Sequence, residues 1–163
     1  MKKIILLAVL GLSLAACKKS TPNTDSYVKA TIDGVNYNFN KIMYNSLIKD
    51  TTLAGDDGQL LQVSAAVDSG ENSTDIEFYL IDSTGIKDQS YSSINNHNVF
   101  FTPKGSPLPY DFGSVDHPVI FTVTSITSSV IQGTFGGNVY YGGDKNAAVK
   151  VITNGKFYIN LNQ

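Results

Sequence analysis

The chain has 163 residues, with twelve lysines, no arginine, fourteen acidic residues and a formal net charge of −2 at pH 7. Proteins that bind nucleic acid usually carry basic patches and arginines that hold phosphate or guanine, so this composition argues against nucleic acid as a partner. Cys17 is the single cysteine, which excludes a disulfide framework. The fold must therefore depend on an ordinary apolar core, and the length suits one domain.

The first twenty residues combine a basic start, a short apolar run and a cysteine. Two lysines at positions 2 and 3 precede an apolar run over 4–14. A signal-peptide core spans about 7–15 residues, whereas a membrane-spanning helix needs about 20. The run leads into Leu14, Ala15, Ala16 and Cys17. This stretch resembles the lipobox, which implies cleavage before the cysteine, a diacylglycerol thioether on its sulfur, and acylation of its new amino group by a fatty acid such as palmitate.

The resemblance divides the chain into a cleaved signal at 1–16, a lipidated tether at 17–26 and one domain at 27–163. Stable membrane anchoring takes more than one acyl chain, which the expected modifications supply. Lys18 stands where many lipoproteins retained at the inner membrane have aspartate, so we expect delivery to the outer membrane. Surface-exported relatives place acids just after the cysteine. The first acid here is Asp25, which favours the periplasmic face.

From Tyr27 onward, alternation of apolar and polar residues predicts strands. The pair Asp33–Gly34 predicts a two-residue hairpin, because a type I′ turn needs positive φ at both loop positions. Asn154–Gly155 gives a second hairpin signal of the same kind, and three glycines within 130–141 predict a bulge or bend. We expect an irregular loop over 103–118, which contains three of the five prolines. The predicted strands are 28–32, 35–39, 42–48, 59–67, 76–81, 99–102, 119–124, 130–141, 147–153 and 156–161.

The domain contains no convincing 3.6-residue period, so it is predicted to be all-β. We expect about eight to ten antiparallel strands in a β-sandwich or an up-and-down β-barrel, two architectures that bury the same alternate residues. Four phenylalanines are expected inside: Phe78, Phe121, Phe135 and Phe157. Three tyrosines are expected to face outward, where they could stack on a sugar or line a protein contact: Tyr79, Tyr140 and Tyr158. Because tyrosine favours sheet surfaces by propensity alone, we prefer the interpretation that they have no binding role.

Three stretches together resemble a known group of proteins: "IDGVNYNF", "IQGTFGGNVYY" and "ITNGKFYINL". They are similar to small lipoproteins of unknown function from Bacteroidota. The resemblance covers most of the expected mature chain and implies an all-β fold at the cell envelope. Those relatives often have a tryptophan soon after the first Asp-Gly turn, where this chain has Tyr37 or Phe39. The resemblance implies no activity.

Candidate chemistry is sparse. His97 and His117 could form a metal site with Asp111 and Asp116, but they lack His-x-x-x-His spacing and a thiol partner. We therefore expect them to be surface or loop histidines. No Gly-x-Ser-x-Gly element is present to begin a hydrolase triad. The sequence predicts no catalytic residue, no metal and no cofactor.

Three functions from different classes follow from these observations. The preferred one is a non-catalytic binding or interaction module, held at the membrane by the lipid on Cys17, with a glycan or protein partner. The first alternative is a lipocalin-like carrier of a small apolar ligand, which requires a cavity of about 300 Å³ or more inside the barrel. The second is a small enzyme that uses Asp and His side chains in the 97–118 region.

Overall fold

The computed structural model describes residues 25–49, 58–70, 72–93, 97–111 and 117–162. These residues form an antiparallel sheet of eleven strands, which confirms the predicted all-β class. The strands are β1 (Tyr27–Ile32), β2 (Val35–Phe39), β3 (Lys41–Lys49), β4 (Gln59–Ala66), β5 (Asp75–Asp82), β6 (Ser90–Ser92), β7 (Asn98–Thr102), β8 (Tyr110–Asp111), β9 (Ile120–Ile126), β10 (Val130–Tyr141) and β11 (Val149–Asn160). Leu14, Ala15, Ala16, Cys17 and Asp116 lie outside the described residues. Within the described part, no helix has the length and apolar character needed to cross a membrane.

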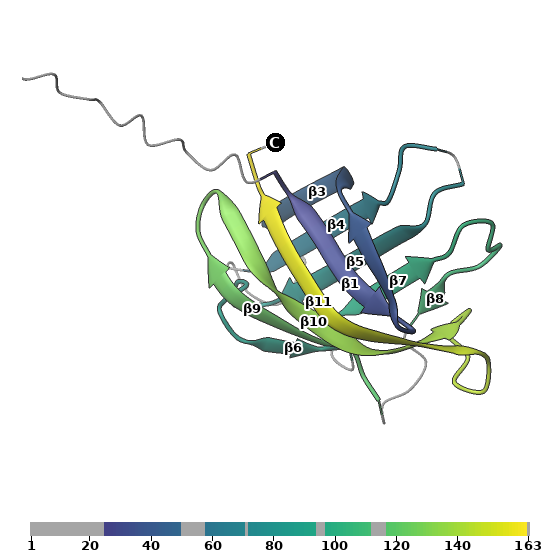
Figure 1. The fold of residues 1–163 in the computed structure, drawn as a ribbon. Coiled ribbons are helices and arrows are strands. Elements are labelled where there is room, and N and C mark those ends of the chain that lie inside the picture. Colours follow the sequence, from purple (N-terminus) through teal and green to yellow (C-terminus); the bar gives the residue numbers. More distant parts are fainter. Residues whose placement is uncertain (1–24, 50–57, 71, 94–96, 112–116, 163) are drawn as a thin grey trace, which may run out of the picture.

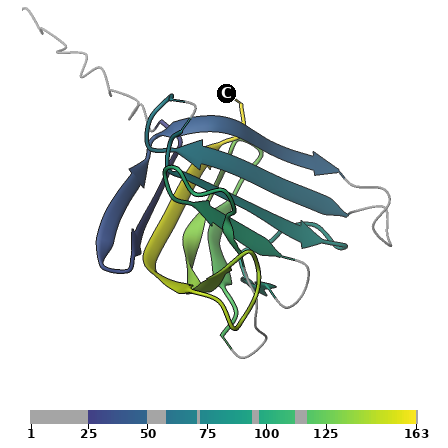
Figure 2. The ribbon, with the colours of Figure 1, turned by 90° about the vertical axis from the view of Figure 1, so that its right-hand side faces the viewer.

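The sheet curls into a nearly closed barrel with the strand order β2-β1-β11-β10-β8-β7-β5-β4-β3. Strand β10 branches the sheet, because its first half pairs with β9 and its last two residues pair with β8. In Figure 1, β1, β11 and β10 run side by side in front of β3, β4 and β5. Figure 2 shows β3 and β4 as part of a second wall. The amide of Asn45 on β3 donates to the Asn160 carbonyl of β11 at 3.5 Å, which links the two walls.

The hairpin predicted at Asp33–Gly34 is confirmed. Both residues have positive φ, 49° and 80°, and Ile32 pairs with Val35 across the turn. The Asp33 carboxylate accepts bonds from the Val151 N–H at 2.9 Å and from the Lys150 ammonium at 2.7 Å. Burial alone would raise the pKa of Asp33, but these two bonds hold it below its ordinary value. The turn is therefore pinned to β11 as well as shaped by its backbone.

The hairpin predicted at Asn154–Gly155 is wrong. Both residues lie inside β11, which runs unbroken for twelve residues. Asn154 has the positive φ of a turn residue, 52°, yet the chain does not reverse there. The register of β11 instead shifts against both β1 and β10, so the pair forms a β-bulge that bends the strand. We predicted a bulge or bend at the glycines of β10, and the register does shift between Phe135 and Gly137. Two steps along β10 there match three along β11, however, so the extra residue belongs to β11.

Glycine and phenylalanine alternate across β10 and β11 in a reciprocal arrangement. Gly133 lies opposite Phe157, and Phe135 lies opposite Gly155. A methyl group on Gly133 would lie 2.6 Å from the Phe157 ring, and one on Gly155 would lie 2.8 Å from the Phe135 ring. Each glycine thus leaves the space that the ring from the neighbouring strand fills, a device that also allows sheets to curve.

Those two rings form the centre of the core. Phe78 of β5 packs against Phe121, Phe135 and Phe157 at ring-centroid distances of 5.4, 6.0 and 5.3 Å. All four side chains are at most 4% exposed, as the sequence predicted. Because they come from β5, β9, β10 and β11, one aromatic cluster joins the two walls of the barrel.

Two smaller expectations need correction. The 103–118 segment is not wholly irregular, because Tyr110 and Asp111 form the short strand β8 between β7 and β10. Tyr140, expected to face outward, is only 8% exposed. The neighbouring residues Val139 and Tyr140 are both buried, so the strict alternation that predicted an outward Tyr140 does not hold at this end of β10, where Tyr140 pairs with Asp111 of β8.

The reciprocal arrangement predicts that Gly155→Ala is strongly destabilising. The added methyl would press on the Phe135 ring and backbone, and overpacking of this kind costs about 1–3 kcal/mol. Urea unfolding measures the change. Gly70→Ala is the matched control, because its methyl would meet only the Asp68 Oδ1 atom at 3.3 Å. An equal loss in both variants would show that the ring contact is not what matters.

Candidate functional site

The first predicted site residue, His97, is buried and engaged in the fold. Its Nδ1 atom accepts a hydrogen bond from the Ile81 N–H at 3.1 Å, and its ring meets Tyr91 edge-on at 5.1 Å. The side chain is 5% exposed, and burial lowers its pKa although Asp82 opposes the shift. A neutral ring whose Nδ1 atom already accepts a backbone bond ties the start of β7 to β5, which is a structural role.

The structure does not bring the other candidates to His97. Asp111 lies on β8, where it pairs with Tyr140, and its neighbour Tyr110 pairs with Phe101. Phe101 is four residues from His97, about 13 Å along an extended strand. His117 is exposed just before β9. Among the described residues, no three His, Cys, Asp or Glu side chains are grouped as metal ligands would be.

The hollow beside His97, of about 270 Å³, contains Asp82 and Tyr91. Both have perturbed pKa values: burial would raise that of Asp82, but bonds from Thr84 hold it low, and burial raises that of Tyr91. Their polar atoms are committed to the loop after β5. Asp82 accepts the Thr84 N–H at 2.7 Å, and the Tyr91 hydroxyl accepts the Lys87 N–H at 2.8 Å. We interpret these groups as the scaffold of that loop.

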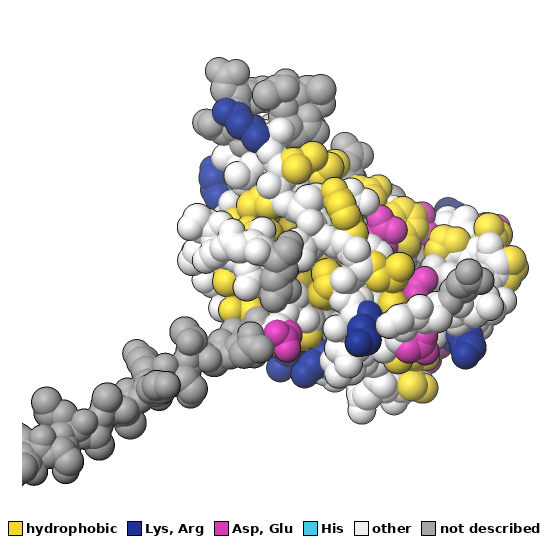
Figure 3. Space-filling model, turned by 90° about the horizontal axis from the view of Figure 1, so that it is seen from above, with side chains coloured by type: hydrophobic (Ala, Val, Ile, Leu, Met, Phe, Trp, Pro, Cys, Tyr) yellow, Lys and Arg dark blue, Asp and Glu magenta, His cyan; other side chains and the backbone are white. Residues whose placement is uncertain are grey.

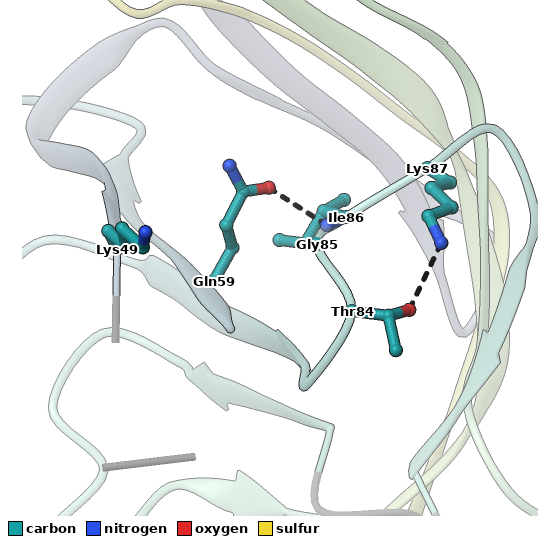
Figure 4. Close-up of a pocket in the computed structure, with 6 residues that line it drawn as sticks. All are labelled: Lys49, Gln59, Thr84, Gly85, Ile86 and Lys87. Carbon is teal, nitrogen blue, oxygen red and sulfur yellow. Dashed lines mark hydrogen bonds between the residues drawn. The ribbon is translucent and has the colours of Figure 1, made fainter. Parts of the chain in front are cut away.

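A second hollow, of about 340 Å³, lies on the other side of the same loop and contains two lysines (Figure 4). Gln59 reaches across from β4 to accept the Ile86 N–H at 2.8 Å, and the Lys87 ammonium donates to the Thr84 hydroxyl at 3.1 Å. The Gln59 bond holds the loop to the sheet and the Lys87 bond lies within the loop, so these groups have structural partners.

Asp75, at the start of β5, is an acid that the sequence did not single out. Burial raises its pKa, a bond from Ser73 opposes the shift, and Asp68 adds to it. Its Oδ1 atom has no hydrogen-bond partner among the described residues. Asp68 itself accepts the Gly70 N–H at 3.0 Å, and the Val67 N–H donates to the Thr74 carbonyl at 3.0 Å. The two acids therefore belong to the tight connection between β4 and β5.

Apolar side chains on β3 are also exposed. Met43, Tyr44 and Ile48 are 68%, 50% and 47% exposed. Figure 3, which looks down from above, shows apolar side chains scattered among polar and charged ones. Because these apolar side chains are dispersed, they give no indication of a partner that would bind over them.

The outer side of β2, β1 and β11 carries the most distinctive set of surface residues, which we name the lysine face. It consists of Tyr27, Lys29, Thr31, Asn36, Asn38, Asn154, Lys156 and Tyr158. Most of them line a hollow of about 540 Å³, into which the bulge at Asn154 brings an additional amide. In the adjacent row, Tyr27 pairs with Tyr158, and their rings lie nearly parallel, 6.0 Å apart at 17°.

Two like charges stand directly opposite each other on this face. Lys29 of β1 pairs in register with Lys156 of β11, and both are exposed. Like charges in that position repel each other and destabilise a sheet. The Lys29 ammonium lies 4.6 Å from the centroid of the Tyr27 ring. Among the described residues, however, the one side-chain ion pair is Lys150 with Asp33, so neither lysine of the face has a carboxylate partner.

The lysines belong to a longer polar row. The row crosses six strands, and neighbouring members are paired in register. In the strand order β2, β1, β11, β10, β9 and β6, its members are Asn38, Lys29, Lys156, Thr134, Thr122 and Ser90. At about 4.8 Å between strands, the row is about 24 Å long. None of these six strands contains an acidic residue. In the other wall, by contrast, the single strand β5 carries three acids: Asp75, Glu77 and Asp82.

Comparison with known proteins adds no relative: no family model, no curated protein and no solved structure matches this chain. The candidate site therefore rests on geometry. Alternation predicted the outward position of Tyr158, which is half-buried on the outer side of β11. It did not predict the lysine pair, because Lys29 and Lys156 come together only through the pairing of the first strand with the last.

The unpaired lysines predict that Lys29→Gln is stabilising. Removing one charge relieves the repulsion across β1 and β11, so we expect the free energy of unfolding to rise by about 0.2–1 kcal/mol. The gain should shrink in 1 M salt, where the Debye length is about 3 Å. Urea unfolding of Lys29→Gln beside the exposed loop control Lys145→Gln measures this effect. A destabilised Lys29→Gln variant would mean that the contact of the ammonium with the Tyr27 ring outweighs the repulsion from Lys156.

Proposed function

We propose that this chain is a lipid-anchored, non-catalytic binding module of the cell envelope and that the lysine face is its binding surface. The observation that carries the proposal is the exposed pair of facing lysines, which have no carboxylate partner in the described part of the chain and lie at a hollow in an acid-free part of the sheet. Repulsion between the two ammonium groups destabilises the sheet, although the contact of Lys29 with the Tyr27 ring offsets part of it. A bound ligand would supply further partners for both lysines.

The filled centre of the barrel favours a binding module over a carrier. A carrier keeps space between its walls for a ligand, whereas here Phe78, Phe121, Phe135 and Phe157 meet at the centre. The small-enzyme alternative also loses support, because the Nδ1 atom of His97 already accepts a hydrogen bond from a backbone N–H and the ring lies apart from Asp111. The accessible polar groups of the lysine face instead suit recognition.

The anchor is proposed from the lipobox at 14–17. The tether that follows joins the domain at Tyr27, which is itself part of the lysine face. Ten residues reach at most about 36 Å when fully extended. The lipid and the binding surface would therefore act close together, and the module would hold a ligand near the membrane.

Metabolic labelling tests the anchor. Cells that express the chain and are fed an alkyne analogue of palmitate should label it, and the protein should fractionate with membranes. Cys17→Ser should abolish the label and release the protein from the membrane fraction, because the thioether needs the cysteine sulfur. Persistent labelling of Cys17→Ser would contradict the proposed attachment site.

Retention on immobilised envelope polysaccharides tests the binding surface. We expect the full-length chain, purified in detergent, to be retained and Tyr158→Ala to elute earlier, because the variant loses half of the tyrosine pair. Tyr44→Ala is the matched control, since Tyr44 is an exposed tyrosine on β3. Equal behaviour of the two variants, or no retention of the parent chain, would contradict the assignment of this face.

A further inference from the structure

We infer that the lysine face binds a polysaccharide that carries acidic groups, an inference that rests on the proposed binding function of this face. The first support is charge. Lys29 and Lys156 lack carboxylate partners in the described part of the chain, and the six strands around them contain no acid. A ligand carboxylate or sulfate placed between them would turn a repulsive pair into two attractive contacts.

The second support is the set of neutral groups beside the lysines. The amides of Asn36, Asn38 and Asn154 line the same hollow, and each amide offers both donors and an acceptor. The Thr31 hydroxyl donates to Asn36 Oδ1 at 2.8 Å, which orients that amide. Such amides suit ligand hydroxyls, because a hydroxyl also both donates and accepts hydrogen bonds. A polyhydroxylated ligand therefore fits this hollow better than a simple anion does.

The third support is the aromatic pair in the next row. Tyr27 and Tyr158 are cross-strand partners whose nearly parallel rings stack with their centroids 6.0 Å apart, so together they add an apolar surface beside the lysines. Sugar rings have one apolar face and a polar edge, and an aromatic surface beside amides and ammonium groups matches both. The polar row extends about 24 Å across the strands, which favours an extended polymer over a single small molecule.

A membrane surface is the competing occupant, since lysines and tyrosines also suit anionic headgroups. Shape favours the polysaccharide. The lysine pair borders a hollow lined by amides, and a bilayer surface would leave that hollow unfilled. The ammonium group of lysine is a compact charge that can turn toward different acidic groups, whereas the planar guanidinium of arginine favours one fixed geometry. Lysines therefore suit a polymer whose acidic groups repeat along its length.

Isothermal titration of the full-length chain in detergent tests the inference, with polygalacturonate and dextran sulfate as acidic probes and dextran as the neutral one. We expect binding to the acidic polymers, weakening as salt rises. The double variant Lys29→Gln, Lys156→Gln should bind about tenfold more weakly, as the loss of two exposed charge contacts implies. Lys104→Gln, Lys145→Gln is the control with the same net charge and exposed lysines outside the face.

The outcomes separate the inference from the proposed function. Tight binding to dextran that Tyr158→Ala weakens and the lysine variant does not would overturn the acidic ligand and keep the binding face. Equal losses in the two lysine variants would overturn the role of this pair. Binding to phosphatidylglycerol vesicles but to no polymer would overturn the inference in favour of a membrane surface. Thermal unfolding of each variant separates loss of binding from loss of fold, and Lys29→Gln is expected to fold at least as stably as the parent.

Discussion

The packing of phenylalanine rings over glycines on the neighbouring strand is the contact on which the other features depend. Gly133 and Gly155 make room for Phe157 and Phe135, and these rings then meet Phe78 from the opposite wall. The close approach of β10 and β11 lets both twelve-residue strands bend at the same level, where their registers shift. Curvature and core filling are therefore produced by the same four residues. A sheet without them would be flatter and would leave a gap at its centre.

Because the interior is filled, the surface that we propose for recognition lies on the outer side of the barrel. The bulge in β11 that brings Gly155 under the Phe135 ring also places Asn154, with positive φ, at the hollow of the lysine face. The pairing of β1 with β11 sets Lys29 against Lys156 and Tyr27 against Tyr158. The same backbone features thus shape the core on one side of the sheet and the polar hollow on the other.

The titratable groups divide according to what surrounds them. Asp33, Asp82 and His97 each form a bond with a backbone N–H that fastens a turn or strand end, at distances of 2.7–3.1 Å. Such bonds satisfy the groups within the fold and leave them little freedom to react. The two lysines of the face lie instead beside the register shift between β1 and β11 and face each other. Their mutual repulsion disfavours folding, and it is the observation on which we base the proposed binding surface.

Local sequence determined the all-β class, the first hairpin and the inward phenylalanines, because each depends on a period of two or on the φ angles of adjacent residues. It could not decide whether Asn154–Gly155 reverses the chain or bends it, since both conformations use a positive φ at asparagine. Tertiary structure decided that question, through partners for β11 on both sides. It also decided the position of Tyr140 and the meeting of Lys29 with Lys156, which stand far apart in the chain. Strand register is set by contacts between distant segments, so no local pattern contains it.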